Sequence, residues 1–248
     1  MVQGGCSGGA QKKAEESIAA RNDNIAKIIY SLQHVLALDP CRRFTFGVKM
    51  QNRQLRVWIA CRGVLRTTKP YDYLKDCKGL VRLFIAFAFF SPTALGWDAT
   101  IKCINAPDLS KGEKRQYETK ISDKVFTTLA TLADYAAESF ISRATRVWLV
   151  KDGNGKEYVL KDVWLDEDRP PEHEIRKALL SDVKRVCGEE DLERFKRHML
   201  TPLCFERVQV DGRVDTTNGM MNGKVPFNFS PSPLKIVQPT NYDVAAPM

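Results

Sequence analysis

A four-residue turn at residues 152–155 constrains the fold of this chain more than any other feature of its sequence. Asp152-Gly153-Asn154-Gly155 joins two runs rich in β-branched and aromatic residues, Arg143–Lys151 and Lys156–Leu165. These turn residues tolerate the positive φ angles that a tight hairpin requires, and the flanking runs have the composition of strands. The sequence therefore predicts a β-hairpin over residues 143–165.

A proline pair and a helical pattern follow this hairpin. Pro170-Pro171 ends the strand, and proline is tolerated in the first turn of a helix. Apolar residues then recur at helical spacing through Glu172–Cys187, which predicts an amphipathic helix. We expect a short second helix at Glu189–Met199 and another hairpin, formed by Phe205–Val210 and Arg213–Thr216 around Asp211-Gly212.

The N-terminal half has the pattern of a helix, three strands and a second helix. Apolar residues at three- and four-residue steps predict a helix from Ala14 to about Leu38. Short polar turns then separate three strand-like runs, which favours an antiparallel meander covered by a helix. These runs are Arg43–Met50, Gln54–Cys61 and Gly63–Tyr73, the covering helix is Leu74–Phe90, and further strands are expected at Thr100–Ile104 and Val125–Leu132. The predicted fold class is α+β, with antiparallel sheets and packed helices.

These elements suggest four segments along the chain. Residues 1–13 are rich in Gly, Gln and Lys and are expected to be disordered. Residues 14–112 form an α+β extension, and residues 113–217 form a second α+β unit. Residues 218–248 are rich in Gly, Asn, Pro and Ser, which predicts an irregular C-terminal segment.

Composition excludes several classes of function. The formal charge is +8, but the basic residues are scattered among acidic ones, and no zinc-finger spacing or RNA-binding signature occurs, so a nucleic-acid partner is not expected. The seven cysteines are widely spaced and form no Cys-x-x-Cys pair, which indicates neither a disulfide framework nor a zinc site. The segment Met1–Ala10 is rich in Gly and lacks the apolar core of a signal peptide. The longest apolar run, Leu80–Phe90, is interrupted by Arg82 and is too short to span a bilayer. We therefore expect an intracellular protein with no membrane partner.

Five short sequence segments resemble segments of the fungal-type protein kinase family, and they occur in the same order and at similar spacing. They are Arg43-Phe44-Thr45-Phe46-Gly47, Leu55-Arg56-Val57-Trp58, Ala144-Thr145-Arg146-Val147-Trp148, Val159-Leu160-Lys161-Asp162-Val163-Trp164 and Glu172-His173-Glu174-Ile175. The similarity covers roughly residues 40–215. It implies a kinase-like small lobe at residues 113–217, preceded by the α+β extension.

The resemblance also implies a nucleotide site and an ATP-dependent Ser/Thr phosphotransferase activity. Lys161 corresponds to the strand lysine that contacts the phosphates of ATP, and Glu174 corresponds to the helix glutamate that holds this lysine in place. Glu172 is the competing choice, because it lies near the same end of the helix. Residues i and i+2 of a helix do not share a face, so only one of the two glutamates can pair well with Lys161. Val147 is expected beside the adenine, and Ala144 and Thr145 in the loop that covers the phosphates.

The chain also departs from the kinase pattern. No glycine occurs between Gly112 and Gly153, so the phosphate loop has no Gly-x-Gly-x-x-Gly motif, and Ser142-Arg143-Ala144-Thr145 stands in its place. Small residues leave room for phosphate, so we expect Mg-ATP to bind weakly. The three histidines precede Val, Glu and Met, so no His-Arg-Asp motif exists, and Asp-Phe-Gly and Ala-Pro-Glu are missing as well. Asp211-Gly212 resembles a metal-binding aspartate, but a hairpin turn explains it better.

The prediction is therefore a member or fragment of this kinase family that supplies the nucleotide-facing small lobe, is catalytically incomplete and has no metal ligands of its own. Its expected partner is another protein or the missing large lobe of the kinase. The alternative is a non-catalytic, pseudokinase-like interaction module. An exposed sheet of a small lobe presents apolar surface, which favours association with a partner.

Overall fold

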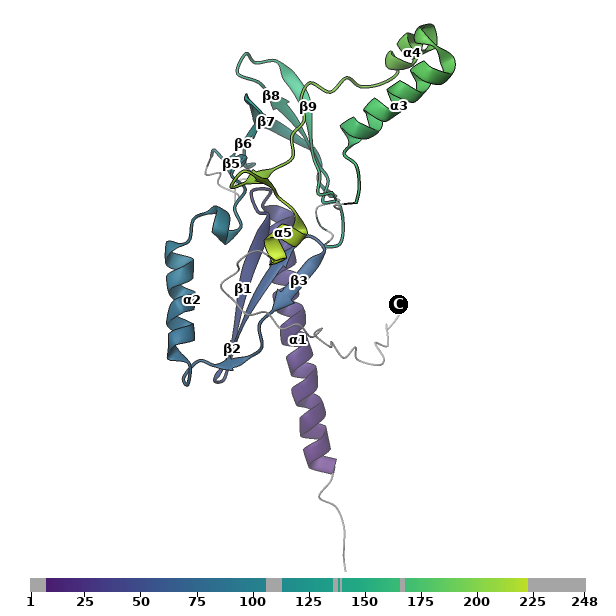
Figure 1. The fold of residues 1–248 in the computed structure, drawn as a ribbon. Coiled ribbons are helices and arrows are strands. Elements are labelled where there is room, and N and C mark those ends of the chain that lie inside the picture. Colours follow the sequence, from purple (N-terminus) through teal and green to yellow (C-terminus); the bar gives the residue numbers. More distant parts are fainter. Residues whose placement is uncertain (1–7, 106–112, 136–137, 139, 166–167, 223–248) are drawn as a thin grey trace, which may run out of the picture.

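The computed structural model describes residues 8–105, 113–135, 138, 140–165 and 168–222 of the chain. Figure 1 shows the two larger antiparallel sheets, one above the other, with a long helix running along the lower sheet; β10 and β11 form a separate two-stranded sheet. The elements in order are α1 (Gly8–Leu38), β1 (Phe44–Gln51), β2 (Gln54–Cys61), β3 (Val64–Thr67), β4 (Tyr71–Asp72), α2 (Cys77–Phe89), the 3-10 helix η1 (Thr93–Leu95), β5 (Ile101–Cys103), β6 (Tyr117–Ile121), β7 (Lys124–Ala133), β8 (Arg146–Lys151), β9 (Glu157–Asp162), α3 (Glu172–Cys187), α4 (Glu189–Lys196), β10 (Gln209–Val210), β11 (Arg213–Val214) and α5 (Thr217–Asn222).

The first sheet is built around β2, which pairs with β1 along its whole length and with β3 and β4 at its two ends. Helix α1 packs on one face of this sheet. Its buried side chains Ile25, Leu32 and Leu36 contact Trp58 and Ala60 of β2, both of which have no exposed surface. This packing uses the apolar stripe that the sequence predicts, because residues spaced by three or four share one side of a helix.

The opposite face of the first sheet is covered by α2 and α5. Leu83 of α2 packs against Leu55 and Val57, and Met221 of α5 packs against Ile59 and neighbouring residues. Asp76 caps α2 by accepting a hydrogen bond from the backbone N–H of Gly79, 2.9 Å away. The first unit therefore has a helix, sheet, helix layering.

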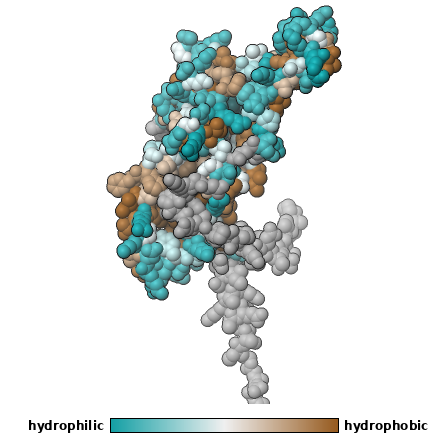
Figure 2. All heavy atoms as spheres, in the orientation of Figure 1, coloured by the Kyte–Doolittle hydropathy of each residue, from teal (hydrophilic) through white to brown (hydrophobic). Residues whose placement is uncertain are grey.

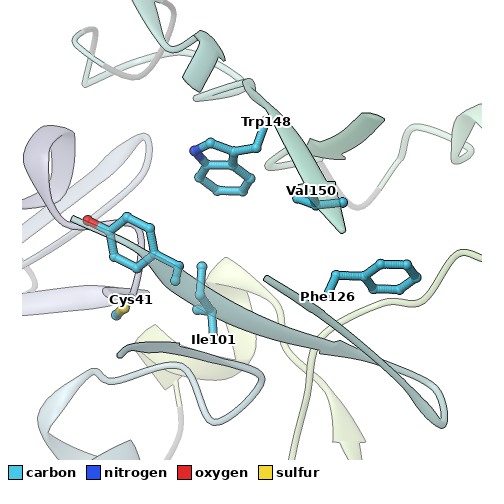
Figure 3. Packing of buried hydrophobic residues seen from close by; sticks show 6 residues of the cluster. Cys41, Ile101, Phe126, Trp148 and Val150 are labelled. Atoms are coloured by element: carbon cyan, nitrogen blue, oxygen red, sulfur yellow. The ribbon is translucent and has the colours of Figure 1, made fainter. Parts of the chain in front are cut away.

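The second sheet has five described strands in the order β5-β6-β7-β8-β9. One of its faces is buried and carries an apolar cluster, shown in Figure 3. Trp148 and Val150 of β8, Phe126 of β7 and Ile101 of β5 meet there with Cys41, which follows α1. Because Cys41 precedes the first sheet in the chain, this cluster joins the two units.

The hairpin β8–β9 confirms the prediction that opened the sequence analysis. Asp152 Oδ1 accepts hydrogen bonds from the backbone N–H groups of Asn154 and Lys156, at 2.9 and 3.0 Å. Gly155 has a φ of 81°, which an L side chain rarely adopts. Pro171 and Gly188 then flank α3, as expected for an N-terminal proline and a C-terminal glycine. Helices α3 and α4 pack on each other and project away from the two sheets (Figure 1).

Several element boundaries differ from the expectation. Helix α1 begins at Gly8, within the segment expected to be disordered, whose residues 1–7 lie outside the described chain. Strand β6 was not expected. The run predicted at Gly63–Tyr73 is divided into β3 and β4, since Pro70 cannot donate to a ladder. Helix α5 continues to Asn222, where irregular structure was expected from residue 218.

Strand β5 belongs to the second sheet, although the predicted boundary between the two units lies after it, at residue 112. It precedes residue 113 in sequence, yet it pairs with β6 of the second sheet. The boundaries at residues 13, 112 and 217 stay predictions. Within the described residues, no helix is long and apolar enough to cross a bilayer.

Candidate functional site

Val147 of β8 and Lys161 of β9 lie directly opposite each other in the β8–β9 ladder. Leu149 and Val159 form the next pair on the same face, because side chains two residues apart in a strand point the same way. The other face of these strands carries the buried cluster with Trp148. Lys161 and Val159 are exposed, so an apolar surface beside the Lys161 ammonium lies on the side of the sheet that faces away from the cluster, and the Lys151–Glu157 pair lies at its far end.

The Lys161 ammonium forms an ion pair with Oε1 of Glu172, the first residue of α3. Glu174 lies elsewhere, with its carboxylate 3.9 Å from Nε2 of His173. The structure thus brings Lys161 together with the competing choice of the sequence analysis and not with Glu174. The reason is geometric, since residues i and i+2 lie on different sides of a helix and only the first faces the end of β9.

This ion pair is exposed to solvent. The side chains of Lys161 and Glu172 retain 40% and 59% of their accessible surface. Exposed pairs contribute only about 0–1 kcal/mol to stability. The pair therefore orients the ammonium group more than it stabilises the fold.

Ala144 and Thr145 lie in the loop before β8. Ala144 is buried and has a φ of 45°, a left-handed conformation that favours glycine. Its backbone N–H donates to Ser142 Oγ, 3.1 Å away. The backbone thus adopts a glycine-type conformation at Ala144, but this N–H is already engaged by Ser142. Thr145 is half-buried.

A cavity of about 800 Å³ curves around β9, the last described strand of the second sheet. Ala144, Val147, Lys161 and Glu172 line it, whereas Thr145 and Glu174 do not. Its far wall is formed by the chain after α4, residues 200–208 and 214–217. The cavity therefore lies between the candidate lysine and the C-terminal part of the described chain.

A buried ion pair fixes this far wall. Arg43 Nη1 lies 2.9 Å from Asp215 Oδ1, and both side chains are less than 10% exposed. The same guanidinium donates from Nη2 to the carbonyl oxygen of Thr93 at 2.7 Å and from Nε to that of Trp97 at 3.2 Å. Burial raises the pKa of the Asp215 carboxyl, and the charge of Arg43 opposes this shift. The pair anchors the segment before α5 to the start of β1.

Sequence reasoning missed Arg43 and Asp215 as wall residues of the cavity. They are 172 positions apart, and no periodicity relates them. The predicted hairpin at Asp211-Gly212 is present as β10–β11, with Asp211 at a φ of 51°. Among the described residues, no group of three or more His, Cys, Asp or Glu side chains is arranged to hold a metal ion.

Comparison with known proteins identifies the family. The sequence model of the family described as fungal protein kinase matches residues 8–224, most of the chain. No curated protein and no solved structure matches the chain. The α+β architecture with antiparallel sheets is consistent with a kinase-like small lobe. By this match the chain belongs to the fungal protein kinase family.

Proposed function

We propose that this chain supplies the nucleotide-binding small lobe of a Ser/Thr-type protein kinase. One observation carries the proposal, namely that Val147 and Lys161 stand opposite each other on the uncovered face of the second sheet, with Glu172 paired to the lysine. A lysine on a strand is a flexible point charge that needs a fixed partner to contact phosphates in one position. The β8–β9 hairpin and α3 provide this arrangement.

The residues present fit the nucleotide better than they fit its metal ion. Val147 and Val159 offer apolar contact for a base, and a cavity of about 800 Å³ is within the usual range for small-molecule sites. Lys161 would bind the phosphates. Magnesium in kinases is held by an aspartate and an asparagine of motifs that this sequence does not contain. We propose that Mg-ATP binds weakly here, with its magnesium ion held by phosphate oxygens and water.

The chain does not contain the residues that perform phosphoryl transfer. The missing His-Arg-Asp motif would supply the aspartate that orients the substrate hydroxyl. Phosphoryl transfer depends on positioning and on neutralising charge, so the chain should bind nucleotide without transferring phosphate by itself. We propose that catalysis needs a kinase large lobe, and that this lobe is the partner of the open sheet face.

Thermal unfolding with and without Mg-ATP tests the proposal. Ligand at one hundred times its dissociation constant stabilises a protein by about 2.7 kcal/mol, which is an easily measured rise in Tm. Lys161→Met should abolish this rise, whereas Lys120→Met, an exposed lysine on β6, should leave it unchanged. Glu172→Gln should weaken binding more than Glu174→Gln. An equal rise in all variants would contradict the assignment.

A non-catalytic interaction module is the second candidate. The observation that favours it is exposed apolar surface around the same site, at Val159 and at Leu200, both of which line the cavity. Surfaces of this kind support association with a protein. If Mg-ATP does not raise the Tm of the unmodified chain, and if the Tm of Lys161→Met is the same with and without Mg-ATP, this candidate is favoured.

A further inference from the structure

Helix α2 has an apolar outer face that no described part of the chain covers. Its inner side packs on the first sheet through Leu83 and Ala86. On its outer side Phe84 and Phe89 retain 60% and 82% of their accessible surface. The outer stripe is formed by Val81, Phe84, Ile85, Ala88 and Phe89, all exposed, at the spacing i, i+3, i+4, i+7 and i+8. Figure 2 shows the corresponding hydrophobic area over α2.

This second stripe is not needed for folding. A globular helix on the surface of a sheet normally has one apolar stripe and a polar opposite side, and single exposed apolar residues need no explanation. Here five exposed apolar positions are contiguous and include two phenyl rings. A contiguous patch of this kind indicates a surface that contacts something other than water.

Apart from Asp76, the N-cap of α2, the charged residues beside the outer stripe are positive. Lys78 and Arg82 are exposed on α2, and Lys75 precedes it. In the described part of the chain none of these three side chains has an ion-pair partner, whereas Arg194 of α4 contacts both Glu190 and Asp191. No acidic residue occurs from 77 to 97. The outer side of α2 therefore matches a partner that is apolar and negatively charged.

The placement of the basic residues distinguishes between kinds of partner. Lys78, Arg82, Ile85 and Phe89 follow one another at steps of four, three and four residues, so they form one row on the helix. The cores of protein interfaces are enriched in arginine but depleted in lysine, so within this row it is Lys78 that argues against a protein partner. At a bilayer surface, by contrast, long basic side chains extend to the headgroups while aromatic rings enter the acyl boundary.

We propose that the outer face of α2 docks on an anionic lipid bilayer. The helix would lie along the surface with Phe84, Ile85 and Phe89 inserted and with Lys78 and Arg82 at the level of the lipid phosphates. A helix of 13 residues is too short to span a bilayer, so this is surface binding only. The inference departs from the expectation of no membrane partner, which came from the search for signal and spanning segments. It is independent of the proposed nucleotide site.

Vesicle sedimentation tests this docking. The full chain should sediment with vesicles of phosphatidylcholine mixed with phosphatidylserine and much less with pure phosphatidylcholine. The double variant Phe84→Gln, Phe89→Gln should lose binding by roughly tenfold or more, since the two rings provide most of the inserted area. Lys78→Gln with Arg82→Gln should also reduce binding by roughly tenfold or more, because each basic residue near an anionic surface contributes about 1 kcal/mol.

Matched controls separate docking from misfolding and from self-association. Val186→Gln removes an exposed apolar side chain on α3 and should leave vesicle binding unchanged. Circular dichroism should show the same Tm for all variants, because every changed side chain is exposed. Equal binding to neutral and anionic vesicles, or no binding to either, would overturn the proposal. A dimer in light scattering that the Phe84→Gln, Phe89→Gln variant dissociates would overturn it in favour of a second copy of the chain.

Discussion

Arg146 of β8 donates from Nη2 to the carbonyl oxygen of Leu36, 2.9 Å away, near the end of α1. The same nitrogen lies 2.9 Å from the carbonyl oxygen of Ala37, and Arg62, in the turn that follows β2, donates to the carbonyl oxygen of Leu36 at 2.7 Å. The last carbonyls of a helix have no partner within the helix, and α1 has no basic residue in its own last turn. Two arginines, Arg146 from the second sheet and Arg62 from the turn after β2, therefore cap the helix and fix the units relative to each other.

Replacing Arg146 by methionine should destabilise the protein by about 2–4 kcal/mol, because the Ala37 carbonyl would lose its side-chain donor, the Leu36 carbonyl would keep only Arg62, and Asp162 would lose its charged partner. Arg146→Lys should recover part of this loss, since an ammonium cannot reach both carbonyls and Asp162 at once. Urea unfolding measures the difference. Arg194→Met, in the exposed α4, is the matched control and should change stability by less than about 0.5 kcal/mol. Equal effects of Arg146→Met and Arg194→Met would show that the cap does not stabilise the fold.

Gly96 should not tolerate a side chain. Its φ is 95°, and a Cβ atom there would lie 2.1 Å from the carbonyl oxygen of Phe44, a backbone atom that cannot move aside. Gly96→Ala should therefore cost about 2–4 kcal/mol of unfolding free energy. Gly153→Ala is the comparison, because nothing lies within 4 Å of a Cβ at that turn. Thermal unfolding should show a lower Tm for the first variant only, and a similar Tm for both would contradict this account.

Local sequence patterns were sufficient to predict those elements whose geometry is set by residues close together in the chain. The hairpin at Asp152–Gly155 followed from turn residues whose own side chain and φ angles set the geometry. Strand β6, by contrast, has the sequence Tyr-Glu-Thr-Lys-Ile, whose polar residues give a weak strand signal. It forms because β5 and β7 pair with it on both sides, and this pairing is not visible in the composition of the strand itself.

The residues of the candidate site likewise include some that the sequence could assign and some that it could not. Lys161 and Val147 could be assigned to neighbouring strands because the turn fixes their register. The choice between Glu172 and Glu174 depends on the direction in which α3 leaves the sheet, which no pattern within the helix encodes. The sequence also does not show which side of α2 is exposed, because both sides of the run Leu80–Phe90 are apolar. Only the packing in the structure shows which side contacts the sheet.

Ala144 adopts a conformation that glycine would take without steric cost. A left-handed φ costs an L residue about 1–2 kcal/mol, which Ala144→Gly would recover. The substitution also loses a buried methyl group and adds freedom to the unfolded chain, together about 1–2 kcal/mol. We therefore expect a nearly neutral change. Ala60→Gly, at a fully buried alanine of β2 without a positive φ, should cost about 1–2 kcal/mol more. Urea unfolding of both variants checks this difference, and equal losses would contradict it.

Two buried thiols should make the protein less stable in alkaline solution. Burial raises the pKa of Cys41 and of Cys61 from 9.0 to about 12. Below pH 9.0 both thiols are protonated in the folded and unfolded states, so their contribution to stability is fully present. Between pH 9.0 and about 12 the unfolded chain releases these protons and the folded chain keeps them. The unfolding free energy should then fall by about 1.4 kcal/mol per pH unit for each thiol.

The dependence on pH, and not the absolute stability, is the quantity to compare between variants, because Cys61→Ala also leaves a small cavity. Urea unfolding at pH values on either side of 9.0 should give a shallower alkaline slope for Cys61→Ala than for the unmodified chain, by about 1.4 kcal/mol per pH unit. Cys77→Ala removes an exposed thiol and should leave the slope unchanged. If Cys61→Ala and Cys77→Ala have the same slope, the Cys61 thiol titrates in the folded protein as it does in the unfolded chain, and its burial against Phe44 and Ile59 has no electrostatic consequence.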